Sequence, residues 1–563
     1  RSDNKRIKIM SIEFDYIIAG GGSAGCVLAS RLAGNSNDSI CLIEAGGKGK
    51  NLFIKMPAGN GFIFGNPKFD WGYQSVKQTQ LNNRKIYFPR GKALGGSSIV
   101  NGMIYIRGVP QDYDNWRQMG LDGWGYSDLL PYFKYSEGSI NRKNKFHGNK
   151  GPLKVEPARN FSELDKAFIK ASVESGHEFL DDFNAEKRSG VSRVDSTTYR
   201  GVRQSSAIAY LKKHPKNLKI FTNTRVSRIL FKKNKAIGIE TIDGRKIYAG
   251  KEVIISQGAF GTPQLLMLSG IGDAKHLMSH DIKPLIDLPG VGQNLADHLD
   301  VSIQYGSDRM DLSTARYQRI DRAAVLMGKW LLNGSGPGGG SLFSTMLFHS
   351  FNDPNYPELQ IYMTPMNIDE NLSDGENEST SILQSLGRKL LVRGKKVAKP
   401  GVQIDINLER PRSLGKVSLY SSNPSDYPKI DPNYLSNKKD LDDLVEGVKV
   451  VRKIMSNSNI SKYLNGEKGP WKNIRSDEEI ISAIRSTAYT GHHPCSTAKM
   501  GNENDIYSVV DKELKVFGIE GLRICDASAM PSQITGNLYA TVLAMAEKAS
   551  DIILKKEIKK PEF

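Results

Sequence analysis

Two adjacent histidines, His492 and His493, stand directly before Pro494 in the stretch TGHHPCSTAKMG near the end of the sequence. Only nine histidines occur in 563 residues, so the pair is a metal site, a catalytic base or a coincidence. Histidine titrates close to neutral pH, which suits it to accept and return protons. Because a proline disfavours helix at the residue before it, His493 is expected to be extended, with the two side chains on opposite sides. Such divergence disfavours a metal site, and no third ligand is evident in the sequence.

A glycine-rich turn near the start of the sequence predicts a dinucleotide site. The apolar run Phe14–Ala19 is typical of a buried parallel strand, and it leads through GGGSAG into a helical pattern. There Gly20 would make the tight turn, Gly22 would let a pyrophosphate approach the backbone, and Gly25 would let the helix pack on the strand. A second apolar strand ends in Glu44, about 20 residues on, where an acid can bind a ribose hydroxyl. These features alone do not distinguish NAD from FAD.

A second glycine-rich stretch, GKALGGSSIVNGMIYIRG, begins at Gly91 and offers backbone amides and hydroxyl groups to the polar edge of a cofactor. From Gly91 to Asp114 it resembles the first signature of the glucose-methanol-choline (GMC) oxidoreductases. The stretch GAFGTPQLLMLSGIG from Gly258 resembles the second signature, and GVGQNLADH and LRICDASAMP are also similar to segments of that family. The resemblance extends over nearly the whole chain.

The resemblance implies an FAD enzyme that acts mainly on alcohols. The expected fold is α/β, with a Rossmann-like FAD-binding domain of the glucose oxidase type and an α+β substrate domain built on an antiparallel sheet. By resemblance, residues 14–118, 218–300 and 490–554 form a discontinuous FAD-binding domain, and residues 119–217 and 301–489 form the substrate domain. The residues expected to bind FAD are Gly20, Gly22, Ser23, Ala24, Gly25, Glu44, Ala45, Gly91, Gly95, Gly96, Ser97, Asn101, Gly102, Val226, Asp526, Ala527, Asn537 and Thr541.

The resemblance also assigns the base that alcohol oxidation needs. In the family this base is the histidine at the position of His493, and its partner, a histidine or an asparagine, falls on Asn537. An asparagine can hydrogen-bond the hydroxyl but cannot compete as a base. His492 is expected to line the pocket or pack, and His298 is expected to be a structural hydrogen-bonding residue.

Two expectations concern single contacts with the flavin. Some members of the family attach FAD covalently through a histidine of the first signature, and the matching position here is Asn101. An amide cannot form that linkage, so FAD is expected to be bound non-covalently. Asp526 is expected to contact the cofactor, and a simple helix or turn cap is its alternative role.

Composition limits the other roles. The net charge is +18, but lysines are scattered among acids and no nucleic-acid motif accompanies them, so no nucleic-acid partner is expected. The four cysteines show no CxxC spacing, which disfavours disulfides and zinc and suits a reducing cytoplasm. The sequence contains no run of 18 apolar residues, so no membrane-spanning helix is expected. The basic segment 383–399 could contact an anionic membrane surface, such as the inner membrane, although a solvated helix or loop is the alternative.

Three further segments carry structural expectations. The alternating runs 402–408 and 415–420 predict strands with one buried face. The run Pro263–Ser269 predicts an amphipathic helix after a buried strand. By composition, the glycine-rich residues 333–340 predict a flexible loop, placed near the mouth of a pocket.

The sequence leaves the substrate and the electron acceptor open. The main hypothesis is oxidation of a primary alcohol to the aldehyde by a choline-dehydrogenase-like enzyme or a relative, with oxygen, a quinone or another molecule as acceptor. The alternative is a different reaction on the same scaffold, such as a cyanohydrin lyase or a light-driven fatty acid decarboxylase. His493 and Asn537 favour alcohol oxidation, since a decarboxylase needs no alcohol base.

Overall fold

The computed structural model describes residues 12–318, 320–368, 378–379 and 398–563. Its largest sheet has seven strands in the order β11-β2-β1-β14-β13-β12, with β27 also paired to β14. Strands β1, β2, β11, β14 and β27 pair in parallel, while β12 and β13 add an antiparallel edge. The strands are β1 (Ile12–Ala19), β2 (Ile40–Ile43), β11 (Leu218–Phe221), β12 (Val226–Lys232), β13 (Lys235–Thr241), β14 (Lys246–Ile255) and β27 (Leu522–Ile524).

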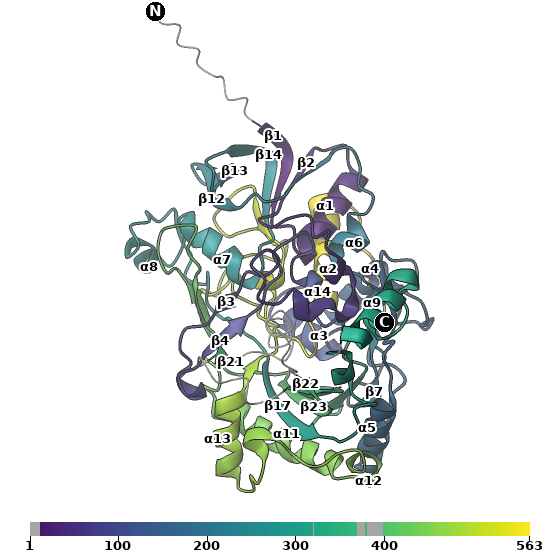
Figure 1. The fold of residues 1–563 in the computed structure, drawn as a ribbon. Helices are drawn as coiled ribbons and strands as arrows, with labels where there is room; N and C mark the ends of the chain where they lie inside the picture. Colours follow the sequence, from purple (N-terminus) through teal and green to yellow (C-terminus); the bar gives the residue numbers. More distant parts are fainter. Residues whose placement is uncertain (1–11, 319, 369–377, 380–397) are drawn as a thin grey trace, which may run out of the picture.

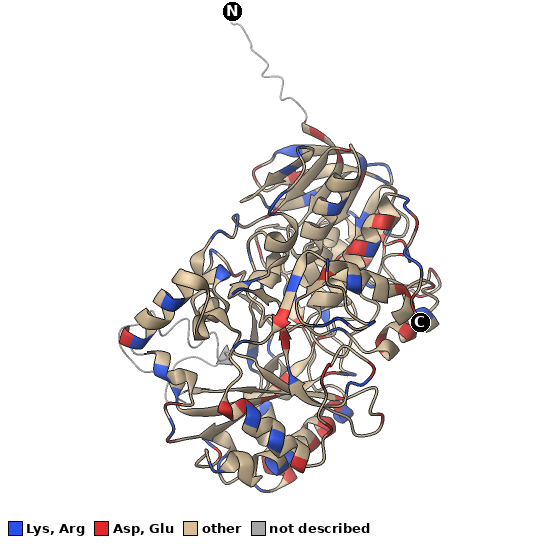
Figure 2. Ribbon diagram, turned by 90° about the vertical axis from the view of Figure 1, so that its right-hand side faces the viewer, with Lys and Arg blue, Asp and Glu red and all other residues tan. Residues whose placement is uncertain are grey.

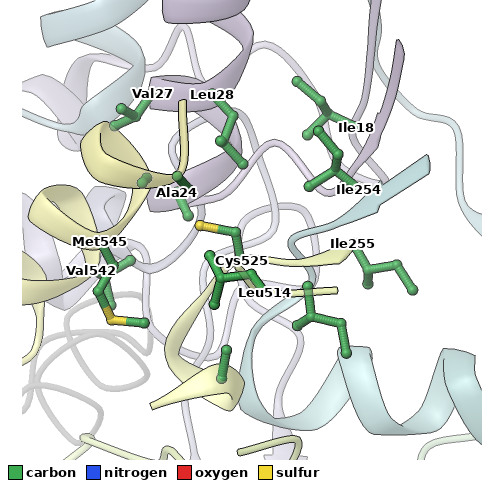
Figure 3. Close-up of a cluster of buried hydrophobic side chains, with 14 of the residues drawn as sticks. Ile18, Ala24, Val27, Leu28, Ile254, Ile255, Leu514, Cys525, Val542 and Met545 are labelled. Atoms are coloured by element: carbon green, nitrogen blue, oxygen red, sulfur yellow. The ribbon is translucent and has the colours of Figure 1, made fainter. Parts of the chain in front are cut away.

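Apolar side chains join this sheet to helix α1 (Ser23–Asn35), and helix α14 (Tyr539–Ile553) packs in turn against α1. Figure 3 shows part of this core, with Ile18 and Ile254 of the sheet on one side, Val27 and Leu28 of α1 at the top and Val542 of α14 on the opposite side. All five side chains are buried. The expected strand, turn and helix at residues 14–32 are therefore present, and the core fixes the turn between them.

The second sheet has six antiparallel strands in the order β26-β17-β23-β19-β18-β7. Helices α5 (Glu163–Glu174), α11 (Lys438–Met455) and α13 (Asp477–Thr487) pack against it, at the lower end of the molecule in Figure 1. The strands are β7 (Gly190–Arg193), β17 (Leu299–Gly306), β18 (Thr345–His349), β19 (Leu359–Thr364), β23 (Gly401–Leu408) and β26 (Tyr489–Thr490). This pair of sheets confirms the expected fold class.

The central strand β23 corrects one expectation. All eight of its residues are buried, whereas its alternating sequence predicted one solvated face. Val402, Ile404 and Ile406 belong to the apolar core, while Gln403 and Asp405 line an internal cavity. The alternating pattern therefore places the apolar side chains in the core and the polar side chains along the cavity. The polar face is enclosed by protein and does not face bulk water.

The other expected elements differ in extent or packing. Helix α7 begins at Gly258, ends at Leu268 and has eight buried residues, so it is not an amphipathic surface helix. Residues 416–418 form β24 (Lys416–Ser418), paired only with β25 (Lys429–Asp431) in a sheet of its own. In the stretch 333–340, expected to be a loose loop, Gly338 and Gly339 are buried and form a short 3-10 turn.

Charged residues lie along most of the described chain, and the cysteines lie in its interior. Figure 2 shows basic and acidic residues interspersed along most of the ribbon. All four cysteines are free and buried. Within the described ranges, no helix is long and apolar enough to cross a membrane, and no three His, Cys, Asp or Glu residues are grouped to hold a metal ion. Most of the basic segment 383–399 lies outside the described residues.

Candidate functional site

A cavity of about 340 Å³ lies between the two sheets, at the carboxyl ends of β1, β2 and β14. Ligands in open α/β sheets bind at this edge. Most of the predicted site residues line the cavity: Gly20, Gly22, Ser23, Ala24, Glu44, Ala45, Gly91, Gly96, Ser97, Asn101, Gly102, Val226, Asp526, Ala527, His493 and Asn537. Residues far apart in sequence are therefore brought to one space.

Three predicted residues, Gly25, Gly95 and Thr541, are not among the cavity lining. Gly95 precedes a 3-10 turn with a φ of +102°, a conformation that favours glycine. Thr541 lies inside α14, where its hydroxyl is 2.7 Å from the Tyr113 hydroxyl. Contacts of these residues with a cofactor would be indirect, through the elements that they hold in place.

The amino end of α1 fits a pyrophosphate. Gly22 caps this 13-residue helix without any side-chain hydrogen bond, so the first amides are left for another acceptor. Gly22 and Gly96 approach so closely that a Cβ atom on Gly96 would lie 2.6 Å from the Gly22 Cα. This backbone cradle matches the close approach that a dinucleotide phosphate needs.

Replacing Gly25 with alanine should prevent the protein from retaining flavin. A Cβ atom at Gly25 would lie 1.9 Å from the Gly20 carbonyl oxygen, so α1 could not stay packed against β1. Flavin absorbance per protein after purification measures the effect, with little or no flavin expected. The control is Gly34→Ala on the exposed end of the same helix, where a Cβ atom meets nothing within 4 Å. Full flavin content in Gly25→Ala would contradict this assignment.

Glu44 lies beside the same turn. Its carboxylate accepts hydrogen bonds from the backbone amides of Gly21 (3.0 Å) and Gly46 (2.7 Å). Burial raises the pKa of this carboxyl, while the two amides act in the opposite direction. Glu44 thus holds the turn and also presents an edge to the cavity, where a ribose hydroxyl would meet it.

Asp526 caps a turn, which was the alternative to its expected contact with the cofactor. Its carboxylate accepts hydrogen bonds from the Ser528 amide (2.7 Å) and hydroxyl (2.5 Å), which caps a 3-10 turn. It also accepts from the Gly258 amide (2.9 Å) and the Thr262 hydroxyl (2.6 Å). Asp526 therefore ties the start of α7 to the C-terminal motif, although it also lines the cavity.

Asn101 is held by Arg203, a residue that the sequence interpretation missed. The Arg203 guanidinium donates to both the side-chain and backbone oxygens of Asn101, each at 2.7 Å. It also donates to Ile54 O (3.1 Å) and the Asn60 side chain. Burial lowers the pKa of Arg203 to about 9. No motif singles out this arginine, because its partners are oxygens from distant parts of the chain.

His493 is joined to three groups beside the cavity. Its Nε2 lies 2.9 Å from the Asn537 amide nitrogen, and its Nδ1 lies 2.9 Å from Nδ1 of His298. Its backbone amide donates to Asp297 (2.7 Å), which also accepts from Thr490 (2.6 Å). Burial, with a smaller effect of nearby His298, lowers the pKa of His493 well below its usual range. The imidazole is therefore neutral at neutral pH.

The hydrogen bonds fix which nitrogen of His493 is free to accept a proton. His298 Nε2 faces the Ile534 carbonyl at 3.1 Å, and a carbonyl only accepts, so that nitrogen carries the hydrogen. In neutral His298 the other nitrogen, Nδ1, is then an acceptor, and His493 must donate to it from its own Nδ1. The lone pair of His493 consequently lies on Nε2, next to Asn537. His298 thus has a hydrogen-bonding role.

His492 departs from the expected conformation. Its φ is +67°, a left-handed conformation, and its side chain lines the same cavity as His493. The expectation that the two residues form an extended pair with diverging side chains therefore fails at His492, whose backbone is not extended. The physical reason lies in the backbone: His492 N donates to the Thr490 hydroxyl (2.8 Å) and His492 O accepts from Arg90 (2.8 Å), which holds a turn.

Two carboxyl groups line the cavity on the side of the second sheet, Asp300 on β17 and Asp405 on β23, and the sequence interpretation had not placed either one. Asp300 accepts a hydrogen bond from the Tyr362 hydroxyl, and Asp405 accepts from Tyr489 (2.7 Å). They are only 1% and 2% exposed. Asp300 Oδ1 has no hydrogen-bond partner among the described residues. Burial raises the pKa of Asp300 well above its usual range, and the neighbouring Asp405 adds to this shift.

Comparison with known proteins agrees with this geometry. Two family models described as GMC oxidoreductase match residues 14–300 and 411–546. The chain is 37% identical to the mitochondrial choline dehydrogenase of Mus musculus, over 96% of this chain and 89% of that protein. It is also 37% identical to an alcohol dehydrogenase [acceptor] of Pseudomonas putida, over 96% of each. A formate oxidase variant from Aspergillus oryzae, studied for modification of its FAD, superposes with a TM-score of 0.85 at 26% identity, covering 97% of this chain and 98% of the other.

Proposed function

Since this chain belongs to the GMC oxidoreductase family and is an FAD-dependent oxidoreductase acting on alcohols, we propose that it oxidises a positively charged primary alcohol to the aldehyde, with His493 as the base. FAD, when bound, supplies the acceptor for the hydride of the alcohol. The observation that carries the proposal is the meeting of His493, Asn537 and the Asp300–Asp405 pair in one cavity.

The geometry around His493 supports its role as the base. Nε2 carries the lone pair, so it can take the hydroxyl proton of an alcohol bound beside it. Asn537 cannot remove a proton, but its amide can donate to the substrate oxygen as charge develops there. Gln360 donates to the Asn537 side-chain oxygen at 3.3 Å, which directs the amide nitrogen toward His493. Asp297 holds the backbone of His493 in this position.

The acidic side of the cavity supports a cationic substrate. Asp300 and Asp405 are enclosed by protein, where a carboxylate attracts a cation more strongly than in water. The rings of Tyr362, Tyr489 and Phe343 also line the cavity, and aromatic faces attract a quaternary ammonium group. A relative at 37% identity is a choline dehydrogenase. We therefore propose choline, or an alcohol of the same charge and size, as the substrate.

We propose that FAD is held without a covalent bond. Asn101 faces the cavity and its side-chain oxygen is bound to Arg203, so this position offers no imidazole for a linkage. Acid precipitation of the purified protein, followed by a spectrum of the supernatant, should release all the yellow colour. A pellet that stays yellow would contradict non-covalent binding.

We propose the domain division that the sequence predicts, with FAD on residues 14–118, 218–300 and 490–554 and the substrate on residues 119–217 and 301–489. The parallel strands and the α1 turn fall in the first set. Strands β7, β18, β19 and β23, including Asp405, fall in the second set. The cavity would then lie between the two domains.

The proposed reaction is tested by its products. With choline as substrate, a trap for carbonyl compounds should recover one aldehyde for each flavin reduced in a single anaerobic turnover. A lyase would release a carbonyl compound without reducing the flavin, and a light-driven decarboxylase would need illumination. Aldehyde formation without flavin reduction would therefore exclude the proposed function.

A further inference from the structure

Glu409 is a buried acid close to the catalytic histidines. It follows β23 directly and is 1% exposed. Its Oε1 atom lies 3.9 Å from Nδ1 of His298, and within the described ranges neither of its carboxylate oxygens makes a hydrogen bond of full geometry, although the Gly536 amide faces the carboxyl. Burying an acid without hydrogen bonds is unfavourable. Such a group beside an active site is a candidate for a functional role.

The side chains around Glu409 supply one positively charged group, Arg188, for two carboxyl groups. Arg188 is 4% exposed, lies over the Phe348 ring at 4.9 Å and donates to the Arg107 carbonyl at 2.8 Å. Asp112, the other acid near Arg188, accepts from the Thr535 amide at 2.8 Å and from the backbone amide of Val109. One guanidinium, which stays charged, thus faces two carboxyl groups.

The groups that face Glu409 act on its pKa in opposite directions. Burial raises the pKa of this carboxyl, the Gly536 amide and Arg188 lower it, and Asp300 and Asp112 raise it. Burial is the largest effect, and the pKa of Glu409 is held well above its usual range. On the histidine side, burial lowers the pKa of His298 to about 3, against the carbonyls of Ile534 and Glu409. His492 and Arg90 also face His493 and disfavour its charged form. Above its raised pKa Glu409 is ionised, and in that form it favours a positive charge on the histidine pair.

We propose, resting on the alcohol oxidation proposed above, that Glu409 stabilises the positive charge that arises when His493 takes the substrate's hydroxyl proton. As the substrate O–H bond breaks, the proton binds to Nε2 of His493. In the same step the proton on Nδ1 of His493 passes across 2.9 Å to Nδ1 of His298. His493 stays neutral, and His298 carries the charge 3.9 Å from Glu409. Glu409 is thus a positioning residue, which acts on the base through His298.

The direct test is a pH titration of the holoenzyme without substrate, extended to alkaline pH and followed by ¹⁵N NMR of labelled histidines. In the wild type the His298 nitrogen signals should shift as Glu409 ionises beside them, and in Glu409→Gln this titration step should be lost. In the wild type kcat should rise with pH through the same step, and in Glu409→Gln this rise should be lost. An unchanged titration would overturn the proposal, because it would mean that Glu409 is not ionised beside the pair.

Two further variants separate charge from structure. Glu409→Asp keeps the charge and should keep most of the wild-type titration. Glu358→Gln removes another acid that is 3% exposed, but this one pairs with Arg410 at 3.2 Å, so the histidine titration should not change. An equal loss of the titration step in Glu358→Gln and Glu409→Gln would assign the effect to general disturbance of the sheet and overturn the proposal.

A measurement on the wild type does not depend on whether a variant folds. If two protons move together, kcat/KM measured in mixtures of H₂O and D₂O should give a curved dependence on the deuterium fraction. A linear dependence would mean that one proton moves, which would overturn the relay through His298. The NMR titration needs no substrate, so it tests Glu409 even if no alcohol reacts, and the two failures can be told apart.

Discussion

Replacing His493 with alanine should lower kcat by about 10²- to 10⁴-fold, the usual contribution of a positioned general base. His493 Nε2 carries the lone pair beside Asn537. His298 cannot replace this base, because it is fully buried behind His493. Single-turnover flavin reduction with saturating substrate measures the effect on the chemical step without interference from the electron acceptor.

The control for this variant is the bound flavin itself. His493→Ala should retain the flavin content and the visible spectrum of the wild type, because the backbone amide of His493 still bonds to Asp297. Reduction at the wild-type rate in a variant with full flavin content would remove His493 from the role of base. Replacing the neighbouring His492 with alanine should cost much less, since it has no bond to Asn537.

Replacing Asp300 with asparagine should raise KM for choline by roughly 10- to 100-fold, equivalent to about 1.4–2.8 kcal/mol. The substitution preserves shape and removes the charge on the acidic side of the cavity. The uncharged isostere 3,3-dimethyl-1-butanol is the matched control substrate, and its KM should change little. An equal increase for both alcohols would show that Asp300 acts on the fold of the site and not on charge.

The same acid gives the reaction a pH dependence of known sign. Burial and the neighbouring Asp405 raise the pKa of Asp300, so below that raised pKa the carboxyl is neutral and attracts a cation weakly. KM for choline should therefore fall as pH rises through this pKa, while KM for the uncharged isostere stays flat. The wild type and Asp300→Asn should accordingly be compared at alkaline pH, where Asp300 is ionised.

Local patterns predicted those parts of the site that are built from neighbouring residues. The turn from Gly20 to Gly25 was predictable from its glycine spacing, and a Cβ atom at Gly20 or Gly25 would lie only 2.3 Å or 1.9 Å from a backbone oxygen. The family resemblance placed His493 and Asn537, and the structure brings them within hydrogen-bond distance. Their roles remain proposals, to be decided by the variants described here.

The parts of the site that the sequence did not predict depend on contacts between residues far apart in the chain. His298 and His493 are separated by 195 positions, and nothing local in the sequence predicts that their rings meet. Asp405 belongs to an alternating strand, and a pattern cannot distinguish a cavity from bulk solvent on its polar side. The left-handed backbone of His492 likewise depends on Arg90, far away in the chain.

The most direct test of the account is anaerobic mixing of the flavin-loaded protein with choline, followed at the visible flavin bands. We expect bleaching that saturates with choline concentration, and much weaker bleaching with the uncharged isostere at the same concentration. Subsequent exposure to air distinguishes an oxidase, in which colour returns quickly, from a dehydrogenase. If choline leaves the flavin fully coloured while a neutral alcohol bleaches it, the assignment of a cationic substrate is wrong.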